Sequence, residues 1–179
     1  MISFRLEKAG EAPLIHDLVH RAFGQEDEAR LVRDLCADGD ALVSMVALQI
    51  DDGQREDGQD ISNIVGHVLF CDVPVQTDKG LLRGAGLAPL SVDPDHQKQG
   101  VGGGLVMQGL KQCRDQGLQV VLVLGDPAYY GRFGFSATLA EGLASPFAGP
   151  AFQALELEAD ILQGTTGKVL YPGAFSNPD

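Results

Sequence analysis

The sequence of 179 residues has few cysteines and no long apolar run. Its three cysteines, Cys36, Cys71 and Cys113, form no Cys-x-x-Cys pair, so we expect neither a metal site nor a redox disulfide, but reduced residues in or near the core. No apolar run approaches the roughly 18 residues that a membrane span requires. The first 13 residues lack the basic patch, apolar run and cleavage site of a secretory signal, which predicts a cytoplasmic protein.

Basic residues are also scarce. Lys and Arg number 13 against 25 Asp and Glu, which gives a net charge of -12. A field of this sign disfavours nucleic acid and anionic lipid, so we expect no nucleic-acid partner and no membrane association, whereas a cationic amine would be attracted. Much of the acidic excess lies in residues 51–60, which we interpret as a solvated surface loop.

The whole sequence is 44% hydrophobic and 21% charged, which is typical of a soluble globular protein. The length predicts a single domain over residues 1–179. Hydrophobic periodicity then predicts helices and strands. The expected helices cover residues 11–23, a stretch through Leu31, Val32 and Leu35, a stretch from the glycine-rich segment to about Gly117, and a short helix between Pro127 and Gly134. The expected strands cover residues 1–9, 41–50, 62–75, 85–92, 119–124 and 152–158.

The order of these elements predicts an α/β fold with a mixed central sheet. Residues 41–50 and 62–75 pair most simply as an antiparallel hairpin. Residues 85–124 read as strand, helix and strand, a unit whose two strands are parallel. Pro89 interrupts the first of these strands, and because proline cannot donate to a ladder, we expect the strand to bulge or splay there.

The helix that follows this strand has an unusual start, with Gly100, Gly102, Gly103 and Gly104 in its first turn. Each glycine inside a helix costs about 1 kcal/mol relative to alanine. Bare amides at a helix N-terminus, at the positive end of its dipole, suit an anionic ligand such as a phosphate. Close packing is the alternative, and it would account for one or two of these glycines but not for four.

Two common phosphate motifs do not fit. A dinucleotide-binding fingerprint starting at Gly100 and Gly102 would need a third glycine where Leu105 stands, and it should follow its strand directly. A P-loop would need lysine where Leu110 follows Gly109. A dehydrogenase reading would therefore rest on glycine content alone.

Residues 97–102, Gln-Lys-Gln-Gly-Val-Gly, match the pattern Gln/Arg-x-x-Gly-x-Gly/Ala. This segment resembles the acyl-CoA-binding motif of the GNAT-type N-acetyltransferase superfamily. Two neighbouring stretches are similar to that family as well: "PLSVDPDHQKQGVG" to its strand, turn and helix, and "LGDPAYYGRFGF" to its next strand end and short helix. In the second stretch Tyr130 stands four residues before Gly134. The resemblance is close over residues 85–136, and the order of elements agrees from residue 1.

The resemblance implies acetyl transfer from acetyl-CoA to a primary amine, on a small molecule or a peptide, by direct attack in a ternary complex. Residues 137–179 would complete the sheet, and a homodimer is a family expectation. Tyr130 would be the general acid that protonates the departing thiolate. The backbone of the splayed strand would pair with the pantetheine arm, and the turn would cradle the pyrophosphate. The residues implied in binding are Leu90, Val92, Gln97, Lys98, Gln99, Gly100, Val101, Gly102 and Gly103.

The general base is not indicated. Many relatives carry a glutamate on the splayed strand, but "AGLAPLSV" contains no acidic residue. Other candidates have plainer explanations: His67 alternates with apolar residues and suits a structural histidine, Asp72 and Asp93 suit turns, and His96 suits a solvent-facing position. A water relay to a backbone carbonyl would be an alternative to a side-chain base.

Two further residues are expected to pack rather than react. Cys113 shares the apolar face of its helix, which predicts an inert buried thiol, and Tyr129 is expected to pack against the core. A different functional class stays open, a non-catalytic acyl-CoA sensor or interaction module, which the absent glutamate favours and Tyr130 opposes. The segments that would shape the acceptor pocket, residues 14–35 and 137–179, carry no diagnostic motif.

Overall fold

The computed structural model describes residues 1–50 and 63–176, so the acidic loop predicted at residues 51–60 lies outside the described residues. The chain groups into two compact units, Met1–Leu69 with Pro89–Leu110, and Phe70–Ala88 with Lys111–Asp179. The helices are α1 (Ala12–Phe23), α2 (Asp27–Ala37), α3 (Val101–Asp115), α4 (Pro127–Tyr130) and α5 (Ala137–Ala140). The strands are β1 (Ile2–Leu6), β2 (Ala41–Gln49), β3 (Ile64–Asp72), β4 (Val75–Thr77), β5 (Gly80–Leu82), β6 (Gly84–Val92), β7 (Val120–Leu124), β8 (Leu143–Ala144), β9 (Phe152–Glu156) and β10 (Gly167–Val169).

These strands form the mixed sheet that the sequence predicts, in the order β1-β2-β3-β6-β7-β9, and a smaller sheet in the order β5-β4-β10-β8. Strands β1 and β2 are antiparallel, and β6 and β7 are parallel, as expected on either side of the glycine-rich helix. The short strands β4, β5, β8 and β10 were not predicted. None of the helices among the described residues has the length and apolarity needed to cross a membrane.

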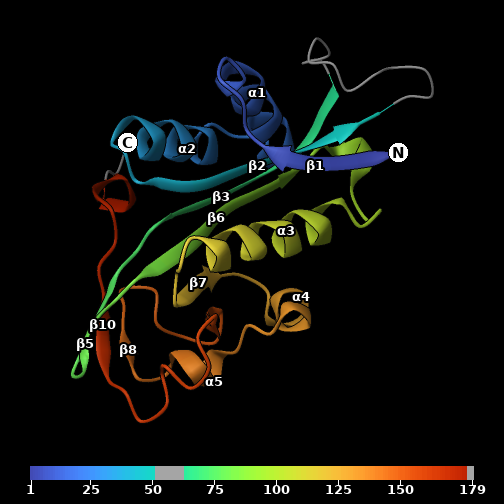
Figure 1. Cartoon of the computed structure of the whole chain (residues 1–179). Helices are drawn as coiled ribbons and strands as arrows, with labels where there is room; N and C mark the ends of the chain where they lie inside the picture. Colours follow the sequence, from blue (N-terminus) through green and yellow to red (C-terminus); the bar gives the residue numbers. More distant parts are fainter. Residues whose placement is uncertain (51–62, 177–179) are drawn as a thin grey trace. The chain divides into compact units, whose positions relative to one another are not determined.

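In the first unit, helices cover both faces of the strands. Helices α1 and α2 lie together on one side, and the first turns of α3 lie on the other (Figure 1). The amphipathic face of α1 buries Ile15, Leu18 and Val19, and the helix ends where Gly24 adopts a left-handed conformation with φ 71°. Such a C-terminal glycine is a common helix stop.

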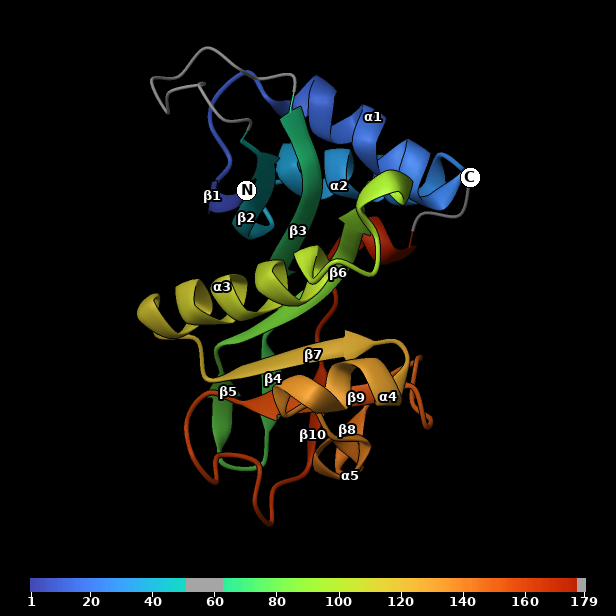
Figure 2. The same cartoon turned by 90° about the vertical axis from the view of Figure 1, so that its right-hand side faces the viewer.

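In the second unit, β7 and β9 lie side by side, with α4 and α5 next to them (Figure 2). Strand β9 is antiparallel to β7 over all five of its residues. Strand β7 is buried along residues 120–123, which agrees with the continuous apolar pattern by which it was predicted. Strand β3 ends at Asp72, and β4 begins only after Pro74, which has no amide proton to donate.

Strand β6 contains the irregularity expected at Pro89. The amide of Asp93 donates to the Val65 oxygen at 2.9 Å, and the amide of Val73 donates to the Gly84 oxygen at 3.0 Å. Between these bonds β3 advances from residue 65 to 73, and β6 advances from residue 84 to 93, one residue more. The extra residue is a β-bulge, and it lies in the span of residues 84–93 that contains Pro89. Among the described residues, the parallel register with β7 runs over residues 84–87. The expected parting of the two strands beyond this register stays a prediction.

Candidate functional site

The turn between β6 and α3 is held by side-chain hydrogen bonds within the first unit. The Oδ1 atom of Asp93 accepts a hydrogen bond from the Asp95 amide at 3.1 Å, and its Oδ2 atom accepts one from Arg21 in α1 at 3.0 Å. Partial burial would raise the pKa of Asp93, but these bonds outweigh it and lower the pKa. The predicted turn role of Asp93 is confirmed. His96 is half-buried with its Nδ1 atom 3.7 Å from Asp93 Oδ1, so the expected solvent-facing position was wrong.

The turn itself contains two left-handed residues, Lys98 with φ 61° and Gly100 with φ 85°. Left-handed residues in a turn aim successive amides into one concave nest, which favours an anion. A Cβ atom at Gly100 would meet nothing within 4 Å, so its backbone conformation, rather than space, requires glycine. The side chain of Gln97 donates to the Val92 oxygen at 3.1 Å, and that of Gln99 donates to the Asp95 oxygen at 3.0 Å.

Helix α3 begins directly after this turn. Its ladder of hydrogen bonds starts with the Gly104 amide, which donates to the Gly100 oxygen at 3.0 Å. The amides of Val101, Gly102 and Gly103 precede that bond, at the positive end of the helix dipole. The turn and the helix start therefore place a run of backbone donors at residues 97–103.

Packing explains one glycine of this helix start. A Cβ atom at Gly104 would lie 2.2 Å from the Cζ atom of Phe4 in β1, and one at Gly66 in β3 would lie 2.9 Å from Leu105. Close packing accounts for Gly104, and backbone conformation accounts for Gly100. This agrees with the expectation that packing accounts for one or two of these glycines, and the phosphate interpretation concerns Gly102, Gly103 and the turn.

Leu90 and Val92 lie on the C-terminal half of β6, the half that is expected to splay. Both are half-buried, and they alternate with Pro89 and Ser91, which are buried. The register with β7 covers residues 84–87 in the described part of the chain, so both residues lie beyond it. The first unit thus contains the nine residues predicted to bind CoA: Leu90, Val92, Gln97, Lys98, Gln99, Gly100, Val101, Gly102 and Gly103.

Tyr130 belongs to the second unit, at the end of α4. The Asp126 side chain caps this helix by accepting from the Ala128 amide at 2.9 Å. The ring of Tyr130 lies over Gly125, where an added Cβ atom would be 2.5 Å from Cε2, and its centroid is 5.7 Å from that of Phe135. Burial, with a smaller contribution from Tyr129, raises the pKa of Tyr130 to about 12, so the phenol is protonated at neutral pH.

Tyr129 differs from the expectation of core packing. It is half-buried, and its ring centroid lies 5.0 Å from that of Tyr130 and 5.5 Å from that of Phe133. The guanidinium of Arg132 stands 4.5 Å from the ring centroid, which is a cation–π arrangement. Tyr129 therefore packs in a surface aromatic group.

The buried residues considered as catalytic candidates are held in unreactive forms. His67 is fully buried, its Nε2 atom lies 2.8 Å from Ser44 Oγ, and burial lowers its pKa to about 3, which confirms a structural, neutral histidine. Burial raises the pKa of Cys113 to about 12, which confirms the inert thiol. Cys36 is exposed, so its predicted place in the core was wrong, and Asp72 is an exposed strand end.

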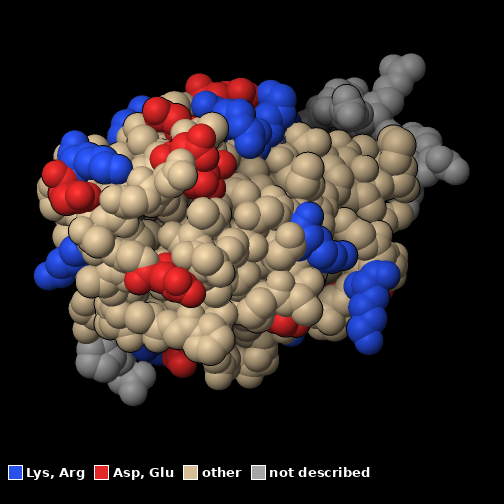
Figure 3. Space-filling model, turned by 90° about the horizontal axis from the view of Figure 1, so that it is seen from below, with Lys and Arg blue, Asp and Glu red and all other residues tan. Residues whose placement is uncertain are grey.

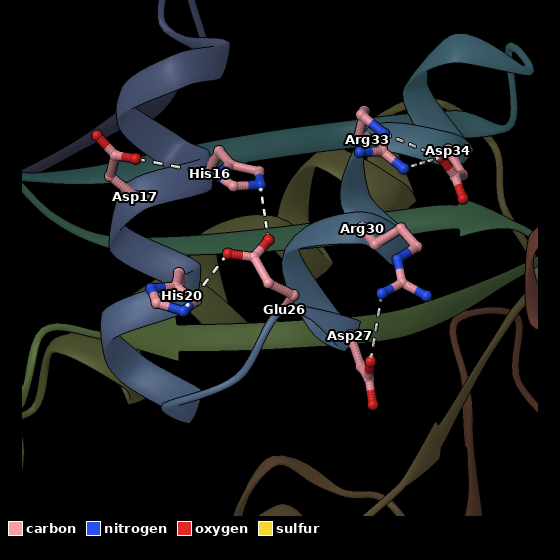
Figure 4. Close-up of polar contacts among 8 residues, drawn as sticks. All are labelled: His16, Asp17, His20, Glu26, Asp27, Arg30, Arg33 and Asp34. Carbon is pink, nitrogen blue, oxygen red and sulfur yellow. Dashed lines mark hydrogen bonds and ion pairs between the residues drawn. The ribbon is translucent and has the colours of Figure 1, made fainter. Parts of the chain in front are cut away.

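The exposed polar groups of α1 and α2 pair with one another (Figure 4). Glu26 lies 3.2 Å from His16 and 3.4 Å from His20, which share one face of α1. Pairs at such exposed positions contribute about 0–1 kcal/mol each. Among the described residues, no group of three His, Cys, Asp or Glu side chains is arranged to hold a metal ion. On the face shown in Figure 3, acidic and basic residues are interspersed and no continuous basic patch is seen among the described residues.

Sequence reasoning missed the side-chain contacts that join distant elements, at the turn and elsewhere in the first unit. Arg21 pairs with Asp93 across 72 residues of sequence, and Ser44 joins Glu7 to His67. No local pattern signals such contacts, because each partner is set by the pairing of distant elements.

Residues 3–138 match the family described as "Acetyltransferase (GNAT) domain". The chain is 38% identical to the protein named "Uncharacterized N-acetyltransferase YhbS" of Escherichia coli strain K12. The matched region of 174 residues covers 96% of this chain and 97% of that protein.

Two solved structures are similar. The crystal structure of YhbS from Escherichia coli in complex with CoA has a TM-score of 0.85 at 36% identity, over 99% of this chain and 93% of that one. A GNAT family acetyltransferase from Brucella melitensis, in complex with acetyl-CoA, has a TM-score of 0.75 at 30% identity, over 98% of both chains.

Proposed function

Because this chain belongs to the GNAT acetyltransferase family, we propose that it transfers the acetyl group of acetyl-CoA to a primary amine by direct attack, with both substrates bound at once. The observation that carries the proposal is the turn at residues 97–103, where left-handed Lys98 and Gly100 lead into a glycine-rich helix N-terminus. The relatives crystallised with CoA and acetyl-CoA support the same ligand here.

Each part of the cofactor has a proposed partner. The backbone amides of residues 97–103 receive the pyrophosphate, and the exposed Lys98 ammonium adds a positive charge beside it. The edge of β6 at Leu90 and Val92 pairs with the pantetheine arm. An amide near Leu90 polarises the thioester carbonyl as the tetrahedral intermediate forms.

The reaction moves two protons. The acceptor ammonium loses one before its nitrogen attacks, and the CoA thiolate gains one as it departs. Tyr130 supplies the second, since its phenol is held protonated by burial. No carboxylate occupies residues 85–92, so we assign the first proton to a water relay that ends on a backbone carbonyl. The net charge of -12 favours a cationic acceptor, on a small molecule or a peptide.

Release of free CoA in the presence of a panel of amines tests this function. We expect at least one primary amine to raise thiol release well above the amine-free rate. The variant Gly102→Asp, which adds a side chain and a negative charge at the amides, should abolish release. Gly173→Asp is the matched control, because a Cβ atom there meets nothing within 4 Å. Tight acetyl-CoA binding without release for any amine would favour the non-catalytic sensor instead.

A further inference from the structure

A chain of hydrogen bonds crosses three neighbouring strands of the first unit. Ser44 in β2 donates its hydroxyl proton to Glu7 Oε2, just beyond β1, and its Oγ atom lies 2.8 Å from Nε2 of His67 in β3. A serine hydroxyl has one proton to give. Since Glu7 receives it, the His67 Nε2 atom must carry a proton and donate to Ser44. The ring is thereby fixed in one tautomer, with Nδ1 as an unprotonated acceptor.

The Nδ1 atom, on the other side of the His67 ring, is a buried hydrogen-bond acceptor. The His67 side chain is 0% exposed, and within the described residues its Nδ1 atom has no hydrogen-bond partner. The same holds for the Oγ atom of Ser91 in β6, a residue only 1% exposed. Buried polar atoms in folded proteins are bonded to protein or to ordered water, so each of these two atoms needs a partner beyond the contacts that the described residues supply.

The register of the strands brings the two atoms together. The hydrogen bond from the Asp93 amide to the Val65 oxygen fixes the pairing of β6 with β3 at this end. With the bulge placed at Pro89, which has no amide proton, counting two residues along each strand from that bond brings Ser91 and His67 opposite each other, and both residues are buried. Opposite Cβ atoms are about 5 Å apart in such a pair, so the two side chains lie close enough to share one water molecule.

We infer that one buried water joins His67 Nδ1 to Ser91 Oγ, and that the chain from Glu7 to Ser91 positions the C-terminal half of β6 for acyl-CoA. This half-strand lies beyond the register with β7, and Pro89 gives it no amide proton. Ser91 stands between Leu90 and Val92, the residues proposed to pair with pantetheine, so a bond through its side chain fixes the strand from the face opposite to theirs. The inference rests on the CoA-binding part of the proposed function.

Acetyl-CoA affinity tests the positioning role without requiring an acceptor. Ser44→Ala and Ser91→Ala should weaken acetyl-CoA binding about fivefold in calorimetric titration, because a smaller fraction of the protein holds the half-strand in the binding geometry. Ser44→Thr keeps the hydroxyl and should bind within about twofold of the wild type. Ser145→Ala is the matched control: Ser145 bonds Tyr171 at 3.0 Å, in the second unit. Wild-type affinity in both Ser44→Ala and Ser91→Ala would overturn the inference.

Two measurements on the intact protein test the chain even if those variants fold poorly. A high-resolution crystal structure should show a water within hydrogen-bond distance of His67 Nδ1 and Ser91 Oγ. Nitrogen NMR should show His67 protonated at Nε2 in the wild type, and Glu7→Ala should populate the Nδ1 tautomer, because Ser44 is then free to donate to Nε2. Separate protein partners for the two atoms, or a wild-type ring protonated at Nδ1, would refute the chain. Neither result depends on turnover, which alone decides the transferase proposal.

Discussion

The ring of Phe4 in β1 fills the space where a side chain at position 104 of α3 would begin. A Cβ atom added to Gly104 would lie 2.2 Å from Cζ and 2.8 Å from two further ring atoms of Phe4. Such a distance requires the ring or the helix to move. Gly104 is therefore a contact point between helix and sheet, although it stands in a run of glycines that otherwise suits an anion.

Gly104→Ala should lower the free energy of unfolding by about 1–3 kcal/mol, because overpacking in a filled space outweighs the better helix propensity of alanine. Chemical denaturation measures it. The double variant Phe4→Leu with Gly104→Ala should recover part of the loss, and the acetyl-CoA affinity of the folded protein should stay within about twofold of the wild type. A more stable Gly104→Ala protein would contradict the packing assignment.

The sequence predicted the mixed sheet, the parallel unit and the break at Pro89, because long strands and helices leave a periodic trace and proline acts locally. Four short strands were missed, since β4, β5, β8 and β10 have at most three residues and cannot show an alternation. The reason for Gly104 was missed because it depends on Phe4, which lies 100 residues away in sequence. The sequence motif of the turn could be recognised, whereas the bonds of Arg21 to Asp93 and of Ser44 to Glu7 and His67 depend on tertiary pairing.

Tyr130→Phe should lower kcat for CoA release by at least about tenfold and leave the KM for acetyl-CoA nearly unchanged, because only the proton donor is lost. The phenylalanine ring fills the same space over Gly125, so the melting temperature should hold. Tyr129→Phe is the matched control, and its kcat should equal that of the wild type. Equal turnover in Tyr130→Phe would remove this residue as the acid.

Thiol labelling should distinguish the three cysteines. Cys36 is exposed, whereas Cys71 and Cys113 are buried. Burial, and then the nearby Glu7 carboxylate, raise the pKa of Cys36, so we expect a slow reaction of one thiol per chain with a disulfide reagent in the native protein. All three cysteines should react after denaturation. Cys36→Ser should remove the native reaction, and a rapid reaction of a second thiol would show that the core around Cys71 or Cys113 opens.

Burial of neutral His67 should make the protein sensitive to acid. Its pKa is about 3 in the folded chain against an ordinary value of 6.5, so below pH 6.5 the unfolded chain binds a proton that the folded chain refuses. Above pH 6.5 His67 is neutral in both states and does not reduce the free energy of unfolding. Below pH 6.5 it reduces the free energy of unfolding by about 1.4 kcal/mol per pH unit as the pH drops toward 3. The pKa values of Glu11 and Asp93 are lowered in the folded protein, so these residues also stabilise it less as the pH falls.

The contribution of His67 is therefore measured as the difference in stability between the wild type and a variant that lacks this histidine. His67→Gln keeps a polar group near Ser44 but has no proton to gain, so urea denaturation at about pH 7.5, 5.5 and 4.5 should show the wild type losing stability faster than the variant, only below the ordinary histidine pKa. At about pH 7.5 the variant should be the less stable of the two, because its amide replaces a well-packed ring. Parallel curves over the whole range would mean that His67 gains its proton in the folded protein, and the ring could not then be the neutral acceptor that the buried chain requires.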